Sequence, residues 1–107
     1  MPRFSVLLPT RNGGELLSDC IKSVLSQDFS DFELVVSDNC SDERSVAAIR
    51  RFDDARIVYL RHDSAVPVSD NWNAALAASR GEYFVMLGDD DGLLPGYLRT
   101  MDHLVRR

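Results

Sequence analysis

The chain has 107 residues, of which 45% are apolar and 27% are charged, and its formal net charge is −5. This length and composition predict one globular domain, residues 1–107, with a core of modest size. The acidic balance leaves no broad basic surface to neutralise a nucleic-acid backbone, so no nucleic acid is expected as a partner. An acidic protein still binds phosphates when a divalent cation lies between them.

In chain order, short apolar runs alternate with amphipathic segments. The first run, residues 4–8, is closed by Pro9, and apolar residues then recur at helical spacing from residue 16 to 25. A second buried-strand run covers 32–37 and is followed by a short helix over 46–52. The third run covers 57–60, and Ser69 or Asp70 is expected to cap a helix that runs through Ala78.

The last third of the chain repeats this alternation. Gly81 is expected to stop the preceding helix, because glycine adopts the left-handed C-terminal conformation without steric cost. A fourth run covers 83–87, and Pro95 suits the first turn of a final helix through Val105. The whole pattern predicts an α/β fold, Rossmann-like, with a mainly parallel sheet and helices on both faces.

Neither the cysteines nor the N-terminal residues indicate export. Cys20 and Cys40 lack metal-ligand spacing, as is typical of a reducing compartment, and we expect both to be inert thiols. The run Phe4–Leu8 is too short for a signal-peptide core or a membrane span. We therefore expect a cytoplasmic chain, or the cytoplasmic part of a larger protein that other segments associate with a membrane.

Three polar clusters follow predicted strands. They are Pro9-Thr10-Arg11-Asn12, Ser37-Asp38-Asn39 and Gly88 to Asp91. Ligands of open parallel sheets bind at the carboxyl ends of the strands, where loops meet helix N-termini. The predicted topology therefore gathers the three clusters along one edge.

The run Asp89-Asp90-Asp91 is the strongest local signal. At ~4 Å and an intermediate dielectric, two carboxylates repel by roughly 4 kcal/mol, and a divalent cation reverses that sign. Carboxylate oxygens suit Mg²⁺ or Mn²⁺, with substrate phosphates and waters as the other ligands. The alternative is a solvated acidic turn that caps the helix near Pro95. Gly88 and Gly92 favour a site, since they leave room for a ligand beside the backbone.

The other two clusters allow two interpretations each. Asp38 and Asn39 are suited to hydrogen-bond a nucleobase edge, but their spacing favours an Asx turn with an N-cap for the next helix. Asn12-Gly13 is also an ordinary turn dipeptide. Arg11 is more suggestive, because it places a cation where a phosphate or a carboxylate can meet it.

Two further features are expected to be structural. Trp72, the only tryptophan, is either a core residue or a ring beside the ligand, and the core is favoured. His62 and Asp63 are neighbours on an extended segment and point to opposite faces, so we expect loop surface rather than a catalytic pair. No phosphate-binding P-loop and no Gly-x-Gly-x-x-Gly turn is present, which removes the main support for ATPase and dehydrogenase functions.

The ordered set of segments resembles the N-terminal, nucleotide-sugar-binding part of family 2 glycosyltransferases of the GT-A fold. The segments that carry the resemblance span almost the whole chain: Pro9-Thr10-Arg11-Asn12, Ser26-Gln27, Glu33 to Asp42, Asn71 to Ala75, Gly81 to Phe84, and Asp89-Asp90-Asp91 with Pro95 beyond. The resemblance implies transfer of a sugar, with inversion, from a nucleoside diphosphate sugar, most commonly a UDP-sugar, to a hydroxyl of a saccharide or lipid-linked acceptor.

The resemblance also implies roles for individual residues. Asp89, Asp90 and Asp91 occupy the acidic catalytic motif, with Asp90 and Asp91 as ligands of Mg²⁺ or Mn²⁺. Gly88 stands where many members have the first aspartate of that motif, which leaves open which carboxylates touch the metal. The positions that match nucleotide contacts are Pro9, Thr10, Arg11, Asn12, Asp38, Asn39, Asn73 and Asp89.

Family domains are longer than this chain, so the resemblance makes it the donor-binding half of a truncated domain, with the catalytic base further along. Such a half leaves a sheet edge or apolar patch uncovered and predicts self-association, for example a homodimer. The alternative function is a non-catalytic nucleotide-binding or dimerising half-domain without an acceptor site. A metal-dependent phosphohydrolase is a weaker option, because no Asp-x-Asp nucleophile motif follows the first strand.

Overall fold

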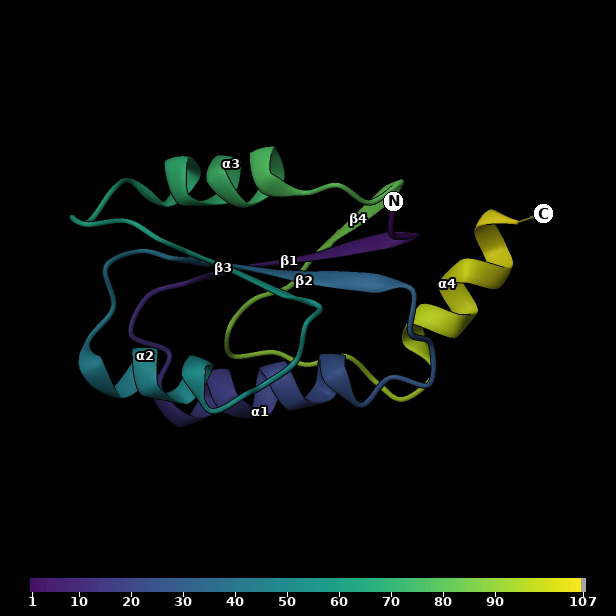
Figure 1. The fold of residues 1–107 in the computed structure, drawn as a ribbon, viewed down its shortest axis with the longest axis horizontal. Coiled ribbons are helices and arrows are strands. Elements are labelled where there is room, and N and C mark those ends of the chain that lie inside the picture. Colours follow the sequence, from purple (N-terminus) through teal and green to yellow (C-terminus); the bar gives the residue numbers. More distant parts are fainter. Residues whose placement is uncertain (107) are drawn as a thin grey trace.

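The computed structural model describes residues 1–106 and consists of a parallel four-stranded sheet with helices on both sides (Figure 1). The strands lie in the order β3-β2-β1-β4, and every neighbouring pair is parallel. Their bounds are β1 Phe4–Thr10, β2 Phe32–Asp38, β3 Ile57–Arg61 and β4 Tyr83–Met86. The α/β fold predicted from the alternating pattern is confirmed, and all four strands fall where apolar runs predicted them.

Strand β1 continues through Pro9, which was expected to close it, and ends at Thr10. Proline cannot donate to a sheet ladder and is tolerated where one side of a strand is free. β4 pairs with β1 only as far as Leu7, so Pro9 has a partner strand on one side alone. As a result Thr10 lies opposite Asp38, and the first two polar clusters leave the sheet side by side.

Each strand is followed by a helix. Their bounds are α1 Gly14–Leu25, α2 Glu43–Arg50, α3 Val68–Ala78 and α4 Tyr97–Val105. Asp42 caps α2 by accepting a hydrogen bond from the Ser45 backbone N–H at 2.9 Å. The predicted cap of α3 was wrong, because its N-cap is Pro67, and Ser69 and Asp70 lie inside the first turn. None of the helices in residues 1–106 is both long and apolar enough to cross a membrane.

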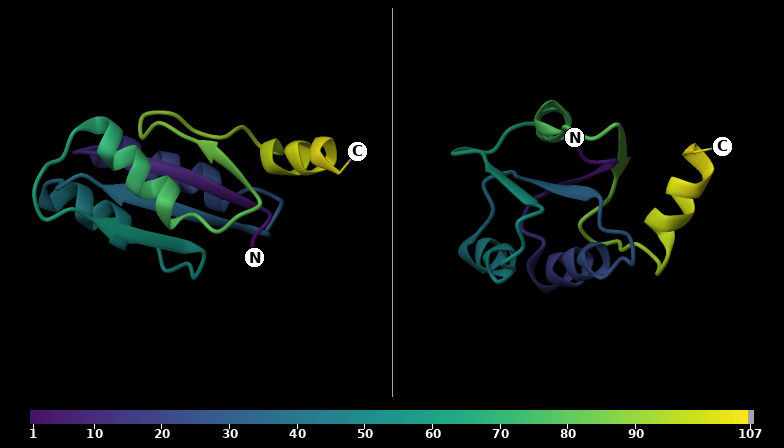
Figure 2. Two further views of the ribbon diagram at one scale, coloured as in Figure 1. Left: turned by 90° about the horizontal axis from the view of Figure 1, so that it is seen from above. Right: turned by 45° about the vertical axis from the view of Figure 1, so that its right-hand side comes forward.

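The core forms on both faces of the sheet because successive residues of a strand point to opposite faces. Val6, Leu8, Leu34 and Val36 lie in the larger cluster with residues of α1, whereas Leu7 and Val35 pack with Ala75 of α3. Figures 1 and 2 show the same layers, with α1 and α2 below the sheet and α3 above it. β1 and β2 are therefore buried on both faces, as their unbroken apolar runs predicted.

The turn between α3 and β4 depends on a buried carboxylate, Glu33. Its Oε2 accepts hydrogen bonds from Ser5 Oγ at 2.5 Å and from the Arg80 backbone N–H at 2.6 Å. Ser5 Oγ in turn accepts from the Gly81 N–H at 2.8 Å. Burial acts to raise the pKa of the Glu33 carboxyl, but the hydrogen bonds from Ser5 and Arg80 outweigh it and hold that pKa below its usual value. This network joins β2, β1 and the start of β4.

Gly81 does not end α3 in a left-handed conformation, so that prediction was wrong. The helix ends at Ala78 with an extended C-cap at Ser79, and the positive-φ glycines are Gly14 and Gly96. Gly81 instead permits a close approach, since an added Cβ would lie 2.6 Å from Ser5 Oγ and 2.7 Å from Ser5 N. The constraint is tertiary contact between distant strands rather than local helix geometry.

Helix α4 begins two residues after Pro95, not at it, and its N-cap is Gly96 with φ 81°. Gln27, just beyond α1, fixes this start: its Oε1 accepts from the Leu98 N–H at 3.0 Å, and its Nε2 donates to the Leu94 carbonyl at 2.9 Å. Leu98 is fully buried against the core. α1 therefore positions the segment that follows the acidic run.

The outer strand β4 leaves apolar side chains exposed, as the expectation of an uncovered edge predicted. Phe84 is 55% exposed and Tyr83 is 42% exposed. β4 pairs with β1 on one side and is the last strand of the sheet on the other. Self-association through this edge stays a prediction.

Candidate functional site at the carboxyl edge of the sheet

A hollow of about 430 Å³ opens where the strands end. Its walls combine the loops after β1 and β2, the start of α3 and the acidic loop after β4, and it is lined by Pro9, Thr10, Arg11, Asn39, Val66, Pro67, Val68, Asn71, Trp72 and Asp89. Five of the predicted nucleotide-binding residues thus share one pocket: Pro9, Thr10, Arg11, Asn39 and Asp89. The topology brings them together because parallel strands deliver every following loop to the same edge.

Thr10 and Asp89 form the contact that joins the first and last polar clusters. Thr10 Oγ1 donates to Asp89 Oδ2 at 2.7 Å, across 79 positions of sequence. Gly13 lies against this pair, since an added Cβ there would be 3.1 Å from Thr10 Oγ1 and 3.2 Å from Asp89 Oδ2. The backbone of the β1–α1 loop therefore approaches the carboxylate closely, and a side chain at position 13 would crowd the mouth of the hollow.

Asp90 and Asp91 are exposed, and neither lines this hollow. Their carboxylates flank Gly88: an added Cβ at Gly88 would lie 3.2 Å from Asp90 Oδ1 and 2.8 Å from Asp91 Oδ2. The space that we expected Gly88 to leave for a ligand is thus occupied by the loop's own carboxylates, and Gly92 faces Ser23. Within residues 1–106, no three His, Cys, Asp or Glu side chains are grouped closely enough to enclose a metal.

Helix α1 supports the acidic loop from below. Ser23 Oγ accepts from the Leu93 N–H at 2.9 Å, and Cys20 Sγ lies 3.5 Å from the Gly88 carbonyl, to which it donates. Burial, followed by the negative charges of Asp89, Asp91 and Asp90, raises the pKa of the Cys20 thiol to about 12. Cys20 therefore stays a thiol at neutral pH, in agreement with the expected inert role.

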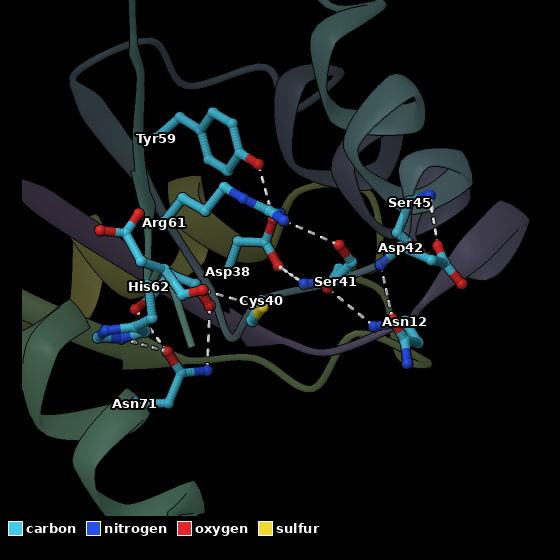
Figure 3. A network of polar contacts seen from close by, with 12 residues as sticks. Asn12, Asp38, Cys40, Ser41, Asp42, Ser45, Tyr59, Arg61, His62 and Asn71 are labelled. Atoms are coloured by element: carbon cyan, nitrogen blue, oxygen red, sulfur yellow. Dashed lines mark hydrogen bonds and ion pairs between the residues drawn. The ribbon is translucent and has the colours of Figure 1, made fainter. Parts of the chain in front are cut away.

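Asp38 is fully buried, and its carboxylate accepts hydrogen bonds from other residues of the chain (Figure 3). Oδ1 accepts from the Ser41 N–H at 3.0 Å, and Oδ2 accepts from Tyr59 at 2.6 Å and from Arg61 at 2.8 Å. Burial acts to raise the pKa of Asp38, but the hydrogen bonds from Ser41, Tyr59 and Arg61 outweigh it and hold that pKa below its usual value. This geometry matches the turn interpretation, while the helix cap falls on Asp42.

The neighbouring amides are also engaged with the backbone. Asn39 lines the hollow, but its side chain clamps Val66, donating to the carbonyl and accepting from the N–H, each at 2.8 Å. Asn12 has φ 53°, lies outside the hollow and accepts from the Asp42 N–H at 2.8 Å (Figure 3). Both residues hold loops at fixed separations, which shapes the pocket whether or not they touch a ligand.

Helix α3 contributes residues that sequence reasoning placed elsewhere. Asn71 lines the hollow, whereas the predicted Asn73 is exposed outside its lining. Asn71 Oδ1 accepts from Ser37 Oγ at 2.7 Å, and His62 Nε2 lies 3.1 Å from the same oxygen, so His62 is tied to the site rather than being free loop surface. Trp72 was expected in the core, but 48% of its surface is exposed and it borders the hollow.

Some of the residues that sequence reasoning missed carry a recognisable signal. Val66, Pro67 and Val68 form one wall of the hollow. A proline that interrupts a polar loop just before a helix is a common sign of a structured helix start. No comparable local signal reveals Ser23 or Gln27, because their partners lie about seventy positions away.

The architecture and the position of the hollow define a class: a parallel α/β domain whose candidate site lies at the carboxyl edge of the sheet, where ligands of such domains bind. The family model for glycosyl transferase family 2 matches residues 5–104, and the chain belongs to this family. Its fold is therefore the GT-A type, as the ordered motifs implied.

Similar proteins agree with this assignment. The chain is 42% identical over 104 residues to the GalNAc(5)-diNAcBac-PP-undecaprenol beta-1,3-glucosyltransferase of Campylobacter jejuni, covering 94% of this chain and 34% of that protein. The TarS structure from S. aureus in complex with UDP-GlcNAc superposes with a TM-score of 0.90 at 24% identity, over 97% of this chain and 31% of that one.

A second similar structure is the mannosyltransferase PcManGT from Pyrobaculum calidifontis in complex with GDP-Man and Mn²⁺. It superposes with a TM-score of 0.75 at 26% identity, over 83% of this chain and 28% of that one. The chain spans about a third of the length of the relatives that it matches.

Proposed function

We propose that the hollow binds the nucleotide of a UDP-sugar and that the chain is the donor-binding part of an inverting, metal-dependent glycosyltransferase. The acceptor we propose is a hydroxyl of a lipid-linked saccharide, because the C. jejuni relative is named for an undecaprenol-linked one. Uridine is proposed as the base because the similar TarS structure holds UDP-GlcNAc.

The Thr10–Asp89 hydrogen bond is the observation that carries this proposal. It holds the end of β1 against the acidic loop after β4. As a result the exposed cation Arg11 and the acidic run lie at the opening of the same hollow. A diphosphate bound at this opening can accept hydrogen bonds directly from the Arg11 guanidinium, which suits phosphate oxygens. It can bind next to the carboxylates only if a cation lies between the phosphates and the carboxylates.

The donor set fits such a cation. Asp90 and Asp91 offer two exposed carboxylates beside Gly88, and Mg²⁺ is commonly held by one or two carboxylates with phosphates and waters as the remaining ligands. A site of this kind needs no enclosed protein cage. We propose that Asp90 and Asp91 hold Mg²⁺ or Mn²⁺, which when bound neutralises negative charge on the departing diphosphate. Mn²⁺ accompanies GDP-Man in the similar mannosyltransferase structure.

The protein's own groups then have separate tasks. Asp89, already hydrogen-bonded to Thr10, is fixed as an acceptor for a ribose hydroxyl at the mouth of the hollow. Asn39 and Val66 keep the β2 loop beside the start of α3, which sets the width of the pocket. Asp38 acts indirectly, because it holds the turn through Ser41 from beneath.

Thermal unfolding of the chain with UDP and Mn²⁺ tests the proposal. A ligand at about 100 times its Kd stabilises by about 2.7 kcal/mol, which raises the Tm of a domain of this size by roughly 10 °C. The shift should need both UDP and Mn²⁺, and Asp90→Ala should abolish it. Asp53→Ala is the matched control, since Asp53 is exposed and lies outside the hollow. An equal shift from UDP without metal, or with Asp90→Ala, would contradict the metal bridge.

A further inference from the structure

Trp72 borders two hollows. It belongs to α3 and has 48% of its surface exposed, although large apolar side chains usually gain by burial. It lines the 430 Å³ hollow with Thr10 and Asp89. It also lines a smaller hollow of about 280 Å³, whose lining is Trp72, Met86, Leu87, Gly88 and Asp91. Trp72 is therefore shared by the two spaces.

The two hollows differ in chemistry and size. The larger one combines polar side chains such as Thr10 and Asp89 with the apolar wall 66–68, whereas the smaller one lies beside Met86, whose side chain packs on the α3 face of the sheet. Pockets for drug-sized ligands have volumes of about 300–1,000 Å³, so the smaller hollow suits a single ring rather than a nucleoside. Its rim carries Asp91, and the acidic loop thus reaches both hollows, through Asp89 in one and Asp91 in the other.

The order of groups in the donor matches this arrangement. A nucleoside diphosphate sugar has its phosphates in the middle, and the acidic loop lies between the hollows. Once the phosphates are at Asp90 and Asp91 and the nucleoside fills the larger hollow, the sugar extends toward the smaller one. Sugar rings present a face of C–H groups, which packs on aromatic and apolar side chains by dispersion and desolvation.

We propose that Trp72, with Met86, forms the platform for the glycosyl ring of the donor. This inference rests on the proposed function and deepens it, because it assigns the sugar subsite to residues of this chain. It explains why the only tryptophan is left half exposed at the start of α3. Hydroxyls on the opposite face of the ring stay free for selective contacts.

Calorimetric titration in the presence of Mn²⁺ tests the platform, with UDP and UDP-GlcNAc as the two probes. For the unmodified chain, we expect UDP-GlcNAc to bind more tightly than UDP. Trp72→Ala should weaken UDP-GlcNAc about fivefold more than it weakens UDP, the difference that corresponds to an aromatic contact of about 1 kcal/mol. Trp72→Phe should restore most of the loss. Leu76→Ala is the control, because Leu76 is exposed on α3 outside both hollows.

Trp72 also reports on its own contacts, because it is the only tryptophan. In the unmodified chain, UDP-GlcNAc should protect its fluorescence from acrylamide quenching more than UDP does, a readout that needs no variant to fold. If the two probes protect the fluorescence equally, or if Trp72→Ala loses the same affinity for both, the indole lies against the nucleotide and the inference is overturned. Loss of neither affinity would overturn it too. Failure of UDP to bind the unmodified chain would instead refute the proposed function and, with it, this platform.

Discussion

Replacing Asp38 with asparagine removes the charge of a carboxylate that is 0% exposed. The remaining oxygen still accepts from the Ser41 N–H, but the new NH₂ group faces two donors, the Tyr59 hydroxyl and the Arg61 guanidinium. Breaking a buried ion pair by removing one partner costs about 3–5 kcal/mol. The Arg61 side chain is 38% exposed and can turn into water, so we expect the lower end, about 3 kcal/mol.

Urea unfolding at pH 7, followed by circular dichroism, measures this loss directly. Asp53→Asn provides the matched control: the same substitution at an exposed position should change the free energy of unfolding by less than about 0.5 kcal/mol. Tyr59→Phe removes only one donor and should cost about 1 kcal/mol. If Asp38→Asn destabilises no more than Tyr59→Phe does, then the buried carboxylate is not the centre of the network and our reasoning is wrong.

Three further predictions concern the supports of the site. Gly81→Ala should destabilise by about 1–3 kcal/mol through overpacking, because the new Cβ would meet strand β1 at 2.6 Å, whereas Gly92→Ala meets only a side chain at 3.2 Å and should cost less. Gln27→Ala should weaken binding of UDP with Mn²⁺ and cost about 1–3 kcal/mol, since it leaves the buried Leu98 N–H and the partly buried Leu94 carbonyl, just after the acidic run, without this partner. Acidification should also destabilise the fold through Asp38 and Glu33, whose folded-state pKa values are held below their usual values. That stability is complete above the unfolded pKa values of about 3.9 and 4.3 and falls as the pH drops through the lower folded values.

Each of these predictions has an outcome that contradicts it. Equal unfolding free energies for Gly81→Ala and Gly92→Ala would show that the close approach at β1 is not tight. A Gln27→Ala chain with normal affinity for UDP and Mn²⁺ would mean that α1 does not position the acidic loop. For the acid prediction, the urea midpoint is measured at pH 3 and at pH 7 in each chain. If the difference between the two midpoints is as large in Asp38→Asn and in Glu33→Gln as in the unmodified chain, these carboxyls are not the source of the acid sensitivity.

The fold was predictable because its signals are local. Apolar runs and helical spacing depend on neighbours within a few residues, and alternation of strands with helices leaves few alternatives to a parallel sheet. The same logic gathered Thr10, Arg11 and Asp89 at one edge, and the hollow confirms that they are close. Element ends were less certain, as Pro9 within β1 and Pro95 before α4 show, because pairing and capping depend on the neighbouring strand or helix.

The sequence by itself determined the order of the elements, the family and the edge of the sheet at which the candidate site lies. Only the tertiary structure decided which side chains are free for a ligand. The spacing of Asp38 allowed a ligand contact or a turn, and only the fold shows Tyr59 and Arg61 on its carboxylate. For Trp72 the core was favoured over a place beside the ligand, and only the position of α3 leaves it bordering two hollows. The physical reason is that a polar group's partners and a ring's exposure depend on segments distant in sequence, which local patterns do not record.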